Sequence, residues 1–149
     1  MKYKETRTGI RDRSAWGRGP WDDEPDYAHW IDEKTGLPCL VVRNNLGGLC
    51  GYVGVGAPHA MYENDYALHY DINVHGGLTY SDACQGMICH DPEEGEDHVW
   101  WFGFDCAHAG DSAPSIGISN SRYTYRGMAY VISEVEDLAR QLKEREEDV

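Results

Sequence analysis

The stretch HVWWFGFD, residues 98 to 105, decides the fold of this chain of 149 residues. Alternation along an extended backbone puts apolar side chains on both of its sides: Trp100, Phe102 and Phe104 on one, and Trp101 on the other with Gly103 and Asp105. A strand that is apolar on both faces is typical of the middle of a sheet, where other elements cover it from both sides. We therefore expect a central strand at 98–105.

Three further segments predict the strands around it. Residues 37–43 and 49–55 indicate a hairpin with its turn at 44–48, and the glycines of its second strand indicate that another part of the chain comes close. The stretch LHYDINVH, residues 68–75, alternates apolar and polar residues and predicts a strand with one solvent-facing side. Residues 121–126 predict an edge strand.

The end of the chain predicts an amphipathic helix. Ser133 and Glu136 match a capping box, and Glu136 has the spacing to pair with Arg140. Apolar residues recur there at helical spacing: Val135, Leu138, Ala139 and Leu142. Several strands followed by one helix indicate the α+β class, with a single domain, a mainly antiparallel sheet and the C-terminal helix packed on it.

Charge and cysteine content narrow the possible partners. The net charge of −13 argues against nucleic acid as the main partner, because phosphate binding depends on clustered cations. Residues 1–13 are rich in Lys and Arg and are expected to be a flexible basic arm before a single domain at 14–149. No stretch predicts a membrane span or a secretory signal, and five cysteines, an odd number, are expected to be reduced and mostly inert. These features predict a cytoplasmic protein.

Polar groups follow the central strand where it ends. Asp105 shares a face with Gly103 and Trp101, and His108 and Asp111 lie in the turn that follows. A bulky wall, a gap left by glycine and convergent polar groups are features of a pocket floor. We expect Trp101 to stack on a ligand there. The alternative is that these polar residues are simply turn formers at a strand exit.

The polar side of the predicted strand at 68–75 is the second candidate. If this strand neighbours 98–105, the residues His75, Asp105 and His108 converge, and they are the predicted catalytic and metal-binding residues. Two imidazoles and a carboxylate can hold one divalent metal ion and leave positions open for water or substrate. The predicted ligand-binding residues are His69, Asp71, Gly76, Gly77, Trp101, Asp111 and Arg122.

A competing metal motif lies in the same residues. His69-x-Asp71 with a distant His108 and Arg122 has the residue types of the iron ligands and acid-binding arginine of 2-oxoglutarate oxygenases. The chain is small for the double-stranded β-helix of those enzymes, so we do not favour this interpretation.

Cysteine chemistry is a further alternative. Cys84-x4-Cys89-His90 suggests a structural zinc site, but a second close pair of ligands is missing from the sequence and buried free thiols are favoured. Cys106 lies near His108, yet strand alternation sends it to the side opposite Asp105, where an inert core thiol is expected.

Five blocks of the sequence resemble a family of small, uncharacterised proteins encoded by phages and by bacterial genomes with prophage-like genes. The blocks are GLPCLVVRN, GGLCGYVGV, DINVHGGLTY, WWFGFDCAHAGD and YRGMAYVISEVEDLARQL, and the similarity covers about residues 20 to 142. The resemblance implies a phage-type origin and a single domain, and it carries no catalytic assignment. By analogy it points to a role in phage–host interplay, in the host cytoplasm, such as the capture or destruction of a host signalling nucleotide.

Two functions are compatible with these residues. The first is a metal-assisted hydrolase of a small phosphorylated or nucleotide-like compound, with one divalent ion on His75, Asp105 and His108. The second is a non-enzymatic binder that sequesters a small signalling molecule or a host protein in the same pocket. Turnover requires an activated water or nucleophile, whereas sequestration requires complementarity alone, and the sequence does not decide between them.

Overall fold

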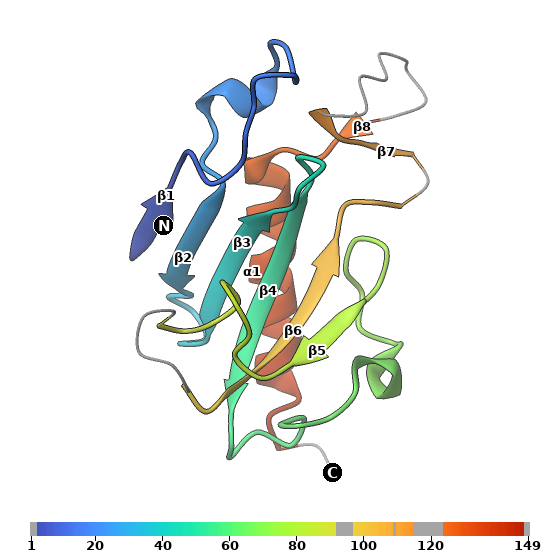
Figure 1. The fold of residues 1–149 in the computed structure, drawn as a ribbon. Helices are drawn as coiled ribbons and strands as arrows, with labels where there is room; N and C mark the ends of the chain where they lie inside the picture. The colour runs from blue at the N-terminus through green and yellow to red at the C-terminus, as the bar shows by residue number, and fades with distance from the viewer. Residues whose placement is uncertain (1–2, 92–96, 109, 115–123, 148–149) are drawn as a thin grey trace.

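The computed structural model describes residues 3–91, 97–108, 110–114 and 124–147. Six strands form one antiparallel sheet in the order β1-β2-β3-β4-β6-β5 (Figure 1). Their bounds are Glu5–Arg7 (β1), Tyr27–Ile31 (β2), Pro38–Arg43 (β3), Leu49–Gly56 (β4), Tyr80–Asp82 (β5) and Val99–Asp105 (β6). The remaining elements are the parallel pair β7 (Asp111–Ser112) and β8 (Thr124–Tyr125), the 3-10 helices η1 (Pro20–Asp23) and η2 (Tyr66–His69), and the helix α1 (Met128–Glu144). The predicted α+β class is confirmed.

Strand β6 lies inside the sheet, as its sequence predicted. It pairs with β4 from Val99 to Asp105 and with β5 on its other side. Phe102 and Phe104 belong to the core beneath α1, whereas Trp101 belongs to the core on the opposite face, and all three are buried. The predicted hairpin is also confirmed, as β3 and β4.

Helix α1 covers one face of the sheet with an apolar stripe. Val135, Leu138 and Leu142 are fully buried in this interface, and burying each contributes roughly 1.5–3 kcal/mol relative to exposure. Gly51 of β4 lies directly beneath the helix, because a Cβ atom there would be 2.5 Å from Cγ2 of Val135. The helix therefore packs closely on the sheet where β4 has no side chain, as the glycines of this strand predicted.

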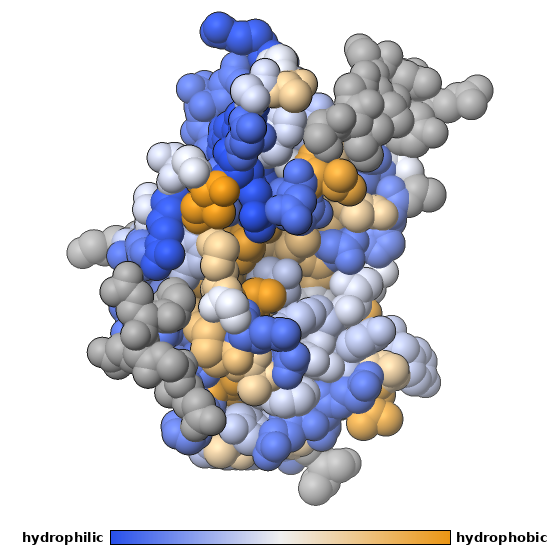
Figure 2. Space-filling view, viewed as in Figure 1, coloured by the Kyte–Doolittle hydropathy of each residue, from blue (hydrophilic) through white to orange (hydrophobic). Residues whose placement is uncertain are grey.

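Loops cover the opposite face of the sheet. Its buried side chains include Tyr27, Leu40, Tyr52 and Trp101. Partly buried residues from the N-terminal segment and from the segment after Thr79 pack on them: Ile10, Tyr80, Met87 and Ile88. Figure 2 views the molecule from this side and shows apolar residues gathered over its middle with polar residues around them. The core thus has two layers, one on each side of the sheet.

The N-terminal segment is docked, which differs from the flexible arm that we predicted at 1–13. Residues 5–7 form the edge strand β1, paired with β2. The fully buried Asp26 accepts the backbone N–H groups of Ile10 and Arg11 at 3.0 Å, and the guanidinium of Arg13 also donates to it. A buried carboxylate requires hydrogen-bond partners, and the arm supplies three of them.

The segment 68–75 does not form the predicted strand. Its residues lie in η2 and the turns after it, with Ile72 and Val74 buried but Tyr70 90% exposed. The Gln141 side chain binds the backbone N–H and C=O of Asn73 at 2.9 and 2.8 Å. A side chain of α1 therefore forms the hydrogen bonds to the backbone of Asn73 that a neighbouring strand would form in a sheet. An alternating pattern also fits a loop held down by two apolar residues.

Helix α1 begins at Met128, upstream of the predicted capping box at Ser133. Oε2 of Glu24 accepts the N–H of Met128 at 2.6 Å, so the cap comes from a distant part of the chain. Arg140 pairs with Asp137 and Glu144, whereas the sequence predicted a pair with Glu136.

Among the described residues, no helix is long and apolar enough to cross a membrane. Of the predicted edge strand at 121–126, residues 124–125 form β8 and 121–123 lie outside the described residues.

The expectation of five reduced cysteines is wrong for two of them. Cys84 and Cys89 form a disulfide, because the turn between them pairs Gln85 with Ile88 and brings the two Cα atoms to 4.6 Å. Cys39, Cys50 and Cys106 are free and buried, and Cys106 lies in the core beneath α1 as predicted.

Thiol titration is expected to count these cysteines in three steps. Burial raises the pKa of Cys50 to about 11 and also raises the pKa values of Cys39 and Cys106, so the native thiols stay protonated and unreactive. Without reductant, a thiol reagent should therefore find almost no reactive group in native protein and three in unfolded protein. Prior reduction should raise the unfolded count to five. Five thiols in unfolded protein that was never reduced would contradict the disulfide.

Candidate metal centre

Three segments that are distant in the sequence meet beyond the end of β6 (Figure 1). His75 lies in the loop between η2 and β5, and His108 and Asp111 lie where the chain passes from β6 to β7. Arg126 lies between β8 and α1, and Tyr130 lies in the first turn of α1. The sheet, the helix and one loop therefore each contribute to the same site.

Side chains of the chain itself shape the turn after β6. Oδ2 of Asp111 accepts the N–H of His108 at 3.0 Å, and Oδ1 of Asp105 accepts the N–H of Ala107 at 3.0 Å. Carboxylates commonly stabilise turns in this way. The turn-forming role that we considered as an alternative is therefore real, and it also fixes both carboxylates in position.

Three metal-ligating groups converge at this turn. His75, His108 and Asp111 each offer one donor atom, and these atoms lie within 4.8 Å of one another. Nε2 of His75 is 2.8 Å from Oδ2 of Asp111, and Nδ1 of His108 is 3.8 Å from the same oxygen. Two imidazole nitrogens and one carboxylate oxygen are a donor set that suits zinc and related divalent ions.

Asp111 supplies the negative charge at the centre of this group. Its side chain is 1% exposed, and Nε of Arg126 donates to its Oδ1 at 2.9 Å. Burial alone would raise the pKa of Asp111, but hydrogen bonds from His75, Arg126 and the backbone of His108 hold the pKa below its ordinary value. The carboxylate is therefore ionised near neutral pH, which is the form that binds a metal.

Tyr130 fixes the orientation of His75. Its hydroxyl group lies 2.7 Å from Nδ1 of His75, and the two rings meet edge to face. With Nδ1 held by Tyr130, Nε2 points at Asp111. A histidine whose second nitrogen is held by an outer partner is the usual arrangement in metal sites.

His108 has a ring nitrogen without a hydrogen bond. Its Nδ1 is buried and has no hydrogen-bond partner among the described residues. The nearest carboxylate oxygen is Oδ1 of Asp105, at 3.4 Å. An unsatisfied buried nitrogen costs free energy and marks a place where a bound ion would be favourable.

Asp105 lies at the edge of this group and not within it. We predicted it as a catalytic and metal-binding residue together with His75 and His108. Its oxygens instead serve the N–H of Ala107 and the hydroxyl group of Thr79, which donates to Oδ2 at 3.1 Å. The structure thus places Asp111 with the two imidazoles, and Asp105 beside His108.

His69 and Asp71 lie elsewhere. The His69 ring packs on the edge of Phe102, and Asp71 forms an ion pair with Arg145 at 2.9 Å. Neither belongs to the group formed by His75, His108 and Asp111. The ligand pattern of 2-oxoglutarate oxygenases is therefore not assembled by the described residues, and Arg122 lies outside them.

Trp101 is not a stacking wall for a ligand. It is completely buried in the core on the loop-covered face of the sheet. The space beside Gly103 is filled as well, because a Cβ atom there would be 2.3 Å from the ring of Tyr52. The gap that we expected next to Asp105 is thus part of a packed core.

Gly76 provides the space that His108 occupies. A Cβ atom at Gly76 would lie 2.2 Å from Cε1 of His108, and the backbone there has φ +70°. Gly77 has a similar φ of +80°, but a Cβ atom there would meet nothing within 4 Å. Substitutions at the two glycines can therefore distinguish the effect of backbone strain, which both share, from displacement of His108, which only Gly76 would cause.

Alanine at each of these glycines is expected to have different effects on metal binding. Both substitutions should cost about 1–2 kcal/mol of unfolding free energy, because both put a side chain in the left-handed region, and Gly76→Ala should cost more because its methyl group also meets His108. Only Gly76→Ala should also weaken zinc binding, since only that methyl group displaces His108. Urea unfolding and zinc titration of the two variants measure this. Equal zinc affinities would show that His108 is not a ligand.

Sequence reasoning missed Tyr130. Because the helix was expected to begin at Ser133, Tyr130 was placed outside it and no contact with His75 was predicted. A helix that begins at Met128 places Tyr130 in its first turn.

Comparison with known proteins adds no assignment, because no protein-family model, curated protein or solved structure matches this chain.

Proposed function

We propose that this protein is a metal-dependent hydrolase that acts on a small phosphorylated or nucleotide-like compound. In this proposal His75, His108 and Asp111 hold one divalent ion of the zinc class. The observation that carries it is the convergence of their three donor atoms within 4.8 Å around a buried carboxylate. The buried, unsatisfied Nδ1 of His108 supports it further.

The donor set leaves coordination positions free for water and substrate. A divalent ion with three protein ligands lowers the pKa of a bound water and polarises a phosphoryl or carbonyl oxygen. Around it, Tyr130 holds His75 in orientation and Asp105 lies beside His108. Tyr130 and Asp105 would thus be the outer groups that hold the two histidine ligands in position, as metal sites require.

A local cation makes the site compatible with an anionic substrate. The protein carries a net charge of −13, which disfavours the approach of a phosphate. Arg126 is partly exposed and borders the site through its bond to Asp111, and its guanidinium lies 5.2 Å from the centre of the Tyr130 ring. In this proposal the Arg126 guanidinium and an ion held by the three ligands would together supply the positive charge that a phosphoryl group requires. In a phage-type protein, a host signalling nucleotide is a substrate of this class.

The test is metal binding followed by turnover. Protein stripped of metal and never reduced should bind about one equivalent of Zn²⁺ by calorimetry. The loaded protein is then assayed on bis(p-nitrophenyl) phosphate, p-nitrophenyl phosphate and a panel of linear and cyclic nucleotides. We expect hydrolysis of at least one phosphate ester that a chelator abolishes and added metal restores.

Two results would contradict the proposal in different ways. Absence of zinc binding by the unreduced protein would remove the metal site. Zinc binding without hydrolysis of any phosphate ester or nucleotide would remove the hydrolase and leave the alternative, a binder that sequesters its ligand.

A further inference from the structure

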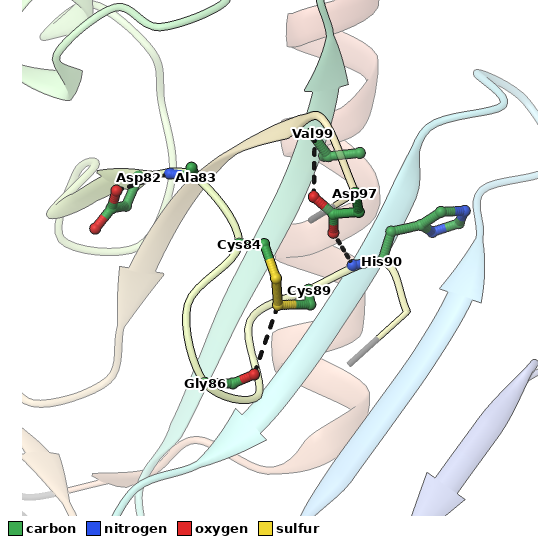
Figure 3. The surroundings of a disulfide bond; sticks show 8 residues. All are labelled: Asp82, Ala83, Cys84, Gly86, Cys89, His90, Asp97 and Val99. Carbon is green, nitrogen blue, oxygen red and sulfur yellow. Dashed lines mark hydrogen bonds between the residues drawn. A yellow bond between two sulfur atoms is a disulfide. The ribbon is translucent and has the colours of Figure 1, made fainter. Parts of the chain in front are cut away.

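A second cluster of metal-ligating residues lies in the connection between β5 and β6. Cys84 follows β5, and Cys89 is joined to it by the disulfide (Figure 3). Asp97, which precedes β6, offers a carboxylate oxygen that lies within 4.8 Å of both sulfur atoms. None of these residues belongs to the site around Asp111.

The Asp97 carboxylate is fixed in place beside the two sulfurs. Its Oδ1 accepts the N–H of Val99 at 3.0 Å, and its Oδ2 accepts the N–H of His90 (Figure 3). The first bond ties it to the start of β6 and the second to the residue after Cys89. The three donor groups are therefore held together by the backbone and not only by the disulfide.

A cavity beside the cluster gives access to it. Cys84 and Asp97 line a cavity of ≈ 230 Å³ together with Tyr62, Ala83, His98 and Val99. Cys84 is partly exposed, whereas Cys89 is buried. A reductant or an ion can therefore reach the disulfide from the side of Cys84, and the cavity has room for a fourth ligand.

We propose that Cys84, Cys89 and Asp97 form a redox-dependent zinc site. A dithiol reductant transfers two electrons and two protons to the disulfide, which breaks the S–S bond and leaves two cysteine thiols and an oxidised, cyclic disulfide of the reductant. Zn²⁺ then binds both sulfurs as thiolates and Asp97 as carboxylate, and the two thiol protons are released to solvent. Reoxidation by a disulfide oxidant reverses these steps and releases the ion.

The chemistry of the donors supports zinc over hard cations. Thiolates are soft ligands that select Zn²⁺ and Cu(I), whereas Mg²⁺ and Ca²⁺ prefer oxygen. His90 was part of the zinc motif that we considered from the sequence. Figure 3 shows its ring pointing away from the sulfurs, and it packs against His29 at a centroid distance of 5.3 Å. Asp97, from beyond the loop, takes the place that His90 had in the motif.

In the reduced state such a site would connect β5 and β6. Both cysteines lie in the segment that leaves β5, and Asp97 lies two residues before the start of β6. Bound zinc would join the Cys84–Cys89 turn to Asp97 in a reducing environment, whereas in an oxidising one the disulfide closes the turn and the N–H of His90 binds Asp97. The loop would thus keep one shape in both redox states, with the ion bound in only one of them.

The experiment counts bound zinc in the full chain carrying Asp111→Asn, which disables the first site. Zn²⁺ is titrated into this protein before and after reduction by a non-chelating phosphine, and excess reductant is removed. We expect one additional equivalent only after reduction. Co²⁺ in place of Zn²⁺ should give thiolate-to-cobalt charge-transfer bands in the near ultraviolet, which report sulfur ligands directly.

Matched variants assign the ligands. Cys84→Ser and Asp97→Asn should each weaken zinc binding by the reduced protein at least about 10-fold. Asp82→Asn and His90→Gln are the controls, because Asp82 binds its neighbour Ala83 and His90 faces away from the sulfurs. Both controls should bind zinc as the parent does.

Several outcomes would overturn the inference. No added equivalent on reduction, or cobalt spectra without charge-transfer bands, would show that the cysteines form a plain structural disulfide. Equal losses in Asp97→Asn and Asp82→Asn would remove Asp97 as a ligand. None of these results bears on the site at Asp111, whose zinc binding is measured in unreduced protein.

Discussion

Asp26→Ala is expected to lose about 3–5 kcal/mol of unfolding free energy, the usual effect of removing one partner from a buried ion pair. Asp26 and Arg43 are both fully buried, and Nε of Arg43 donates to Asp26 at 2.9 Å. Without the carboxylate, the Arg43 charge stays buried with only the more distant Glu24, at 3.4 Å, to compensate it. The N–H groups of Ile10 and Arg11 also lose their acceptor.

The effect should be large because this pair joins four parts of the chain. Nη1 of Arg43 donates to the carbonyl of Gly47 and to the hydroxyl group of Tyr125 in β8, at 2.8 and 2.7 Å. Tyr125 in turn donates to Glu24, which caps α1. The N-terminal arm, the β3–β4 turn, β8 and the helix therefore share one buried network.

Asp22→Ala is the matched control. Asp22 forms an ion pair with Arg18 at 3.4 Å, but the Arg18 side chain is 97% exposed, and exposed pairs contribute little. We expect this variant to lose less than about 1 kcal/mol. Chemical unfolding of both variants decides the matter. Similar losses for the two would show that the buried network does not hold the arm.

Acid should weaken the same network. Burial would raise the pKa of Asp26, but the N–H of Arg11 and the guanidinium groups of Arg13 and Arg43 outweigh it and lower the pKa. A carboxyl group whose pKa is lower in the folded state stabilises the protein above its unfolded-state pKa. That contribution is lost as the pH falls through the folded-state pKa. Stability should therefore fall as the pH drops below about 4, and less so in Asp26→Ala.

The parts of the fold that follow from apolar pattern could be predicted from the sequence. In the run WWFGF at 100–104, Trp101 is buried on one face and Phe102 and Phe104 on the other, and this requires an interior strand wherever it lies in the sheet. Val135, Leu138 and Leu142 likewise define the buried side of a helix without reference to any partner. In both cases the residues that form the pattern are the ones that make the contacts.

The features that failed depend on partners far away in the sequence. The start of α1 is set by Glu24, and the arm is held by Asp26, and neither contact leaves a local signal at 128 or at 10–13. The loop at 68–75 has its backbone bound by Gln141, which lies on a helix. Local pattern cannot reveal such contacts, since the same alternation serves a strand or an anchored loop.

The candidate site was predicted in part and for partly different reasons. His75 and His108 do lie side by side, with ring centroids 5.8 Å apart, but a loop and not a neighbouring strand brings His75 there. Strand alternation favoured Asp105 as the third ligand, because it ends β6. Side-chain alternation applies only within the strand, and in the turn that follows Asp111 folds back and accepts the N–H of His108. Alternation could therefore not show which of the two carboxylates lies with the imidazoles.

Asp111→Asn is accordingly expected to be the most damaging substitution for metal binding. It removes the charged ligand but keeps the shape of the side chain, so Arg126 and His75 retain a nearby polar group. Loss of an outer partner alone weakens metal affinity by about 10- to 100-fold, and loss of a ligand should exceed the upper end of that range. Zinc titration of unreduced protein, with competition by a chelator of known affinity, measures it.

Asp105→Asn is the comparison that separates the two assignments. Asp105 lies 3.4 Å from Nδ1 of His108 and is half-buried, so its loss should affect the orientation of His108 and weaken zinc binding by only about 10-fold. Both variants should keep the native circular dichroism spectrum, because each asparagine can still accept the turn hydrogen bond of its aspartate. If Asp105→Asn weakens zinc binding more than Asp111→Asn does, the ligand predicted from strand alternation is the correct one, and the buried carboxylate of Asp111 serves to bind Arg126 and to shape the turn.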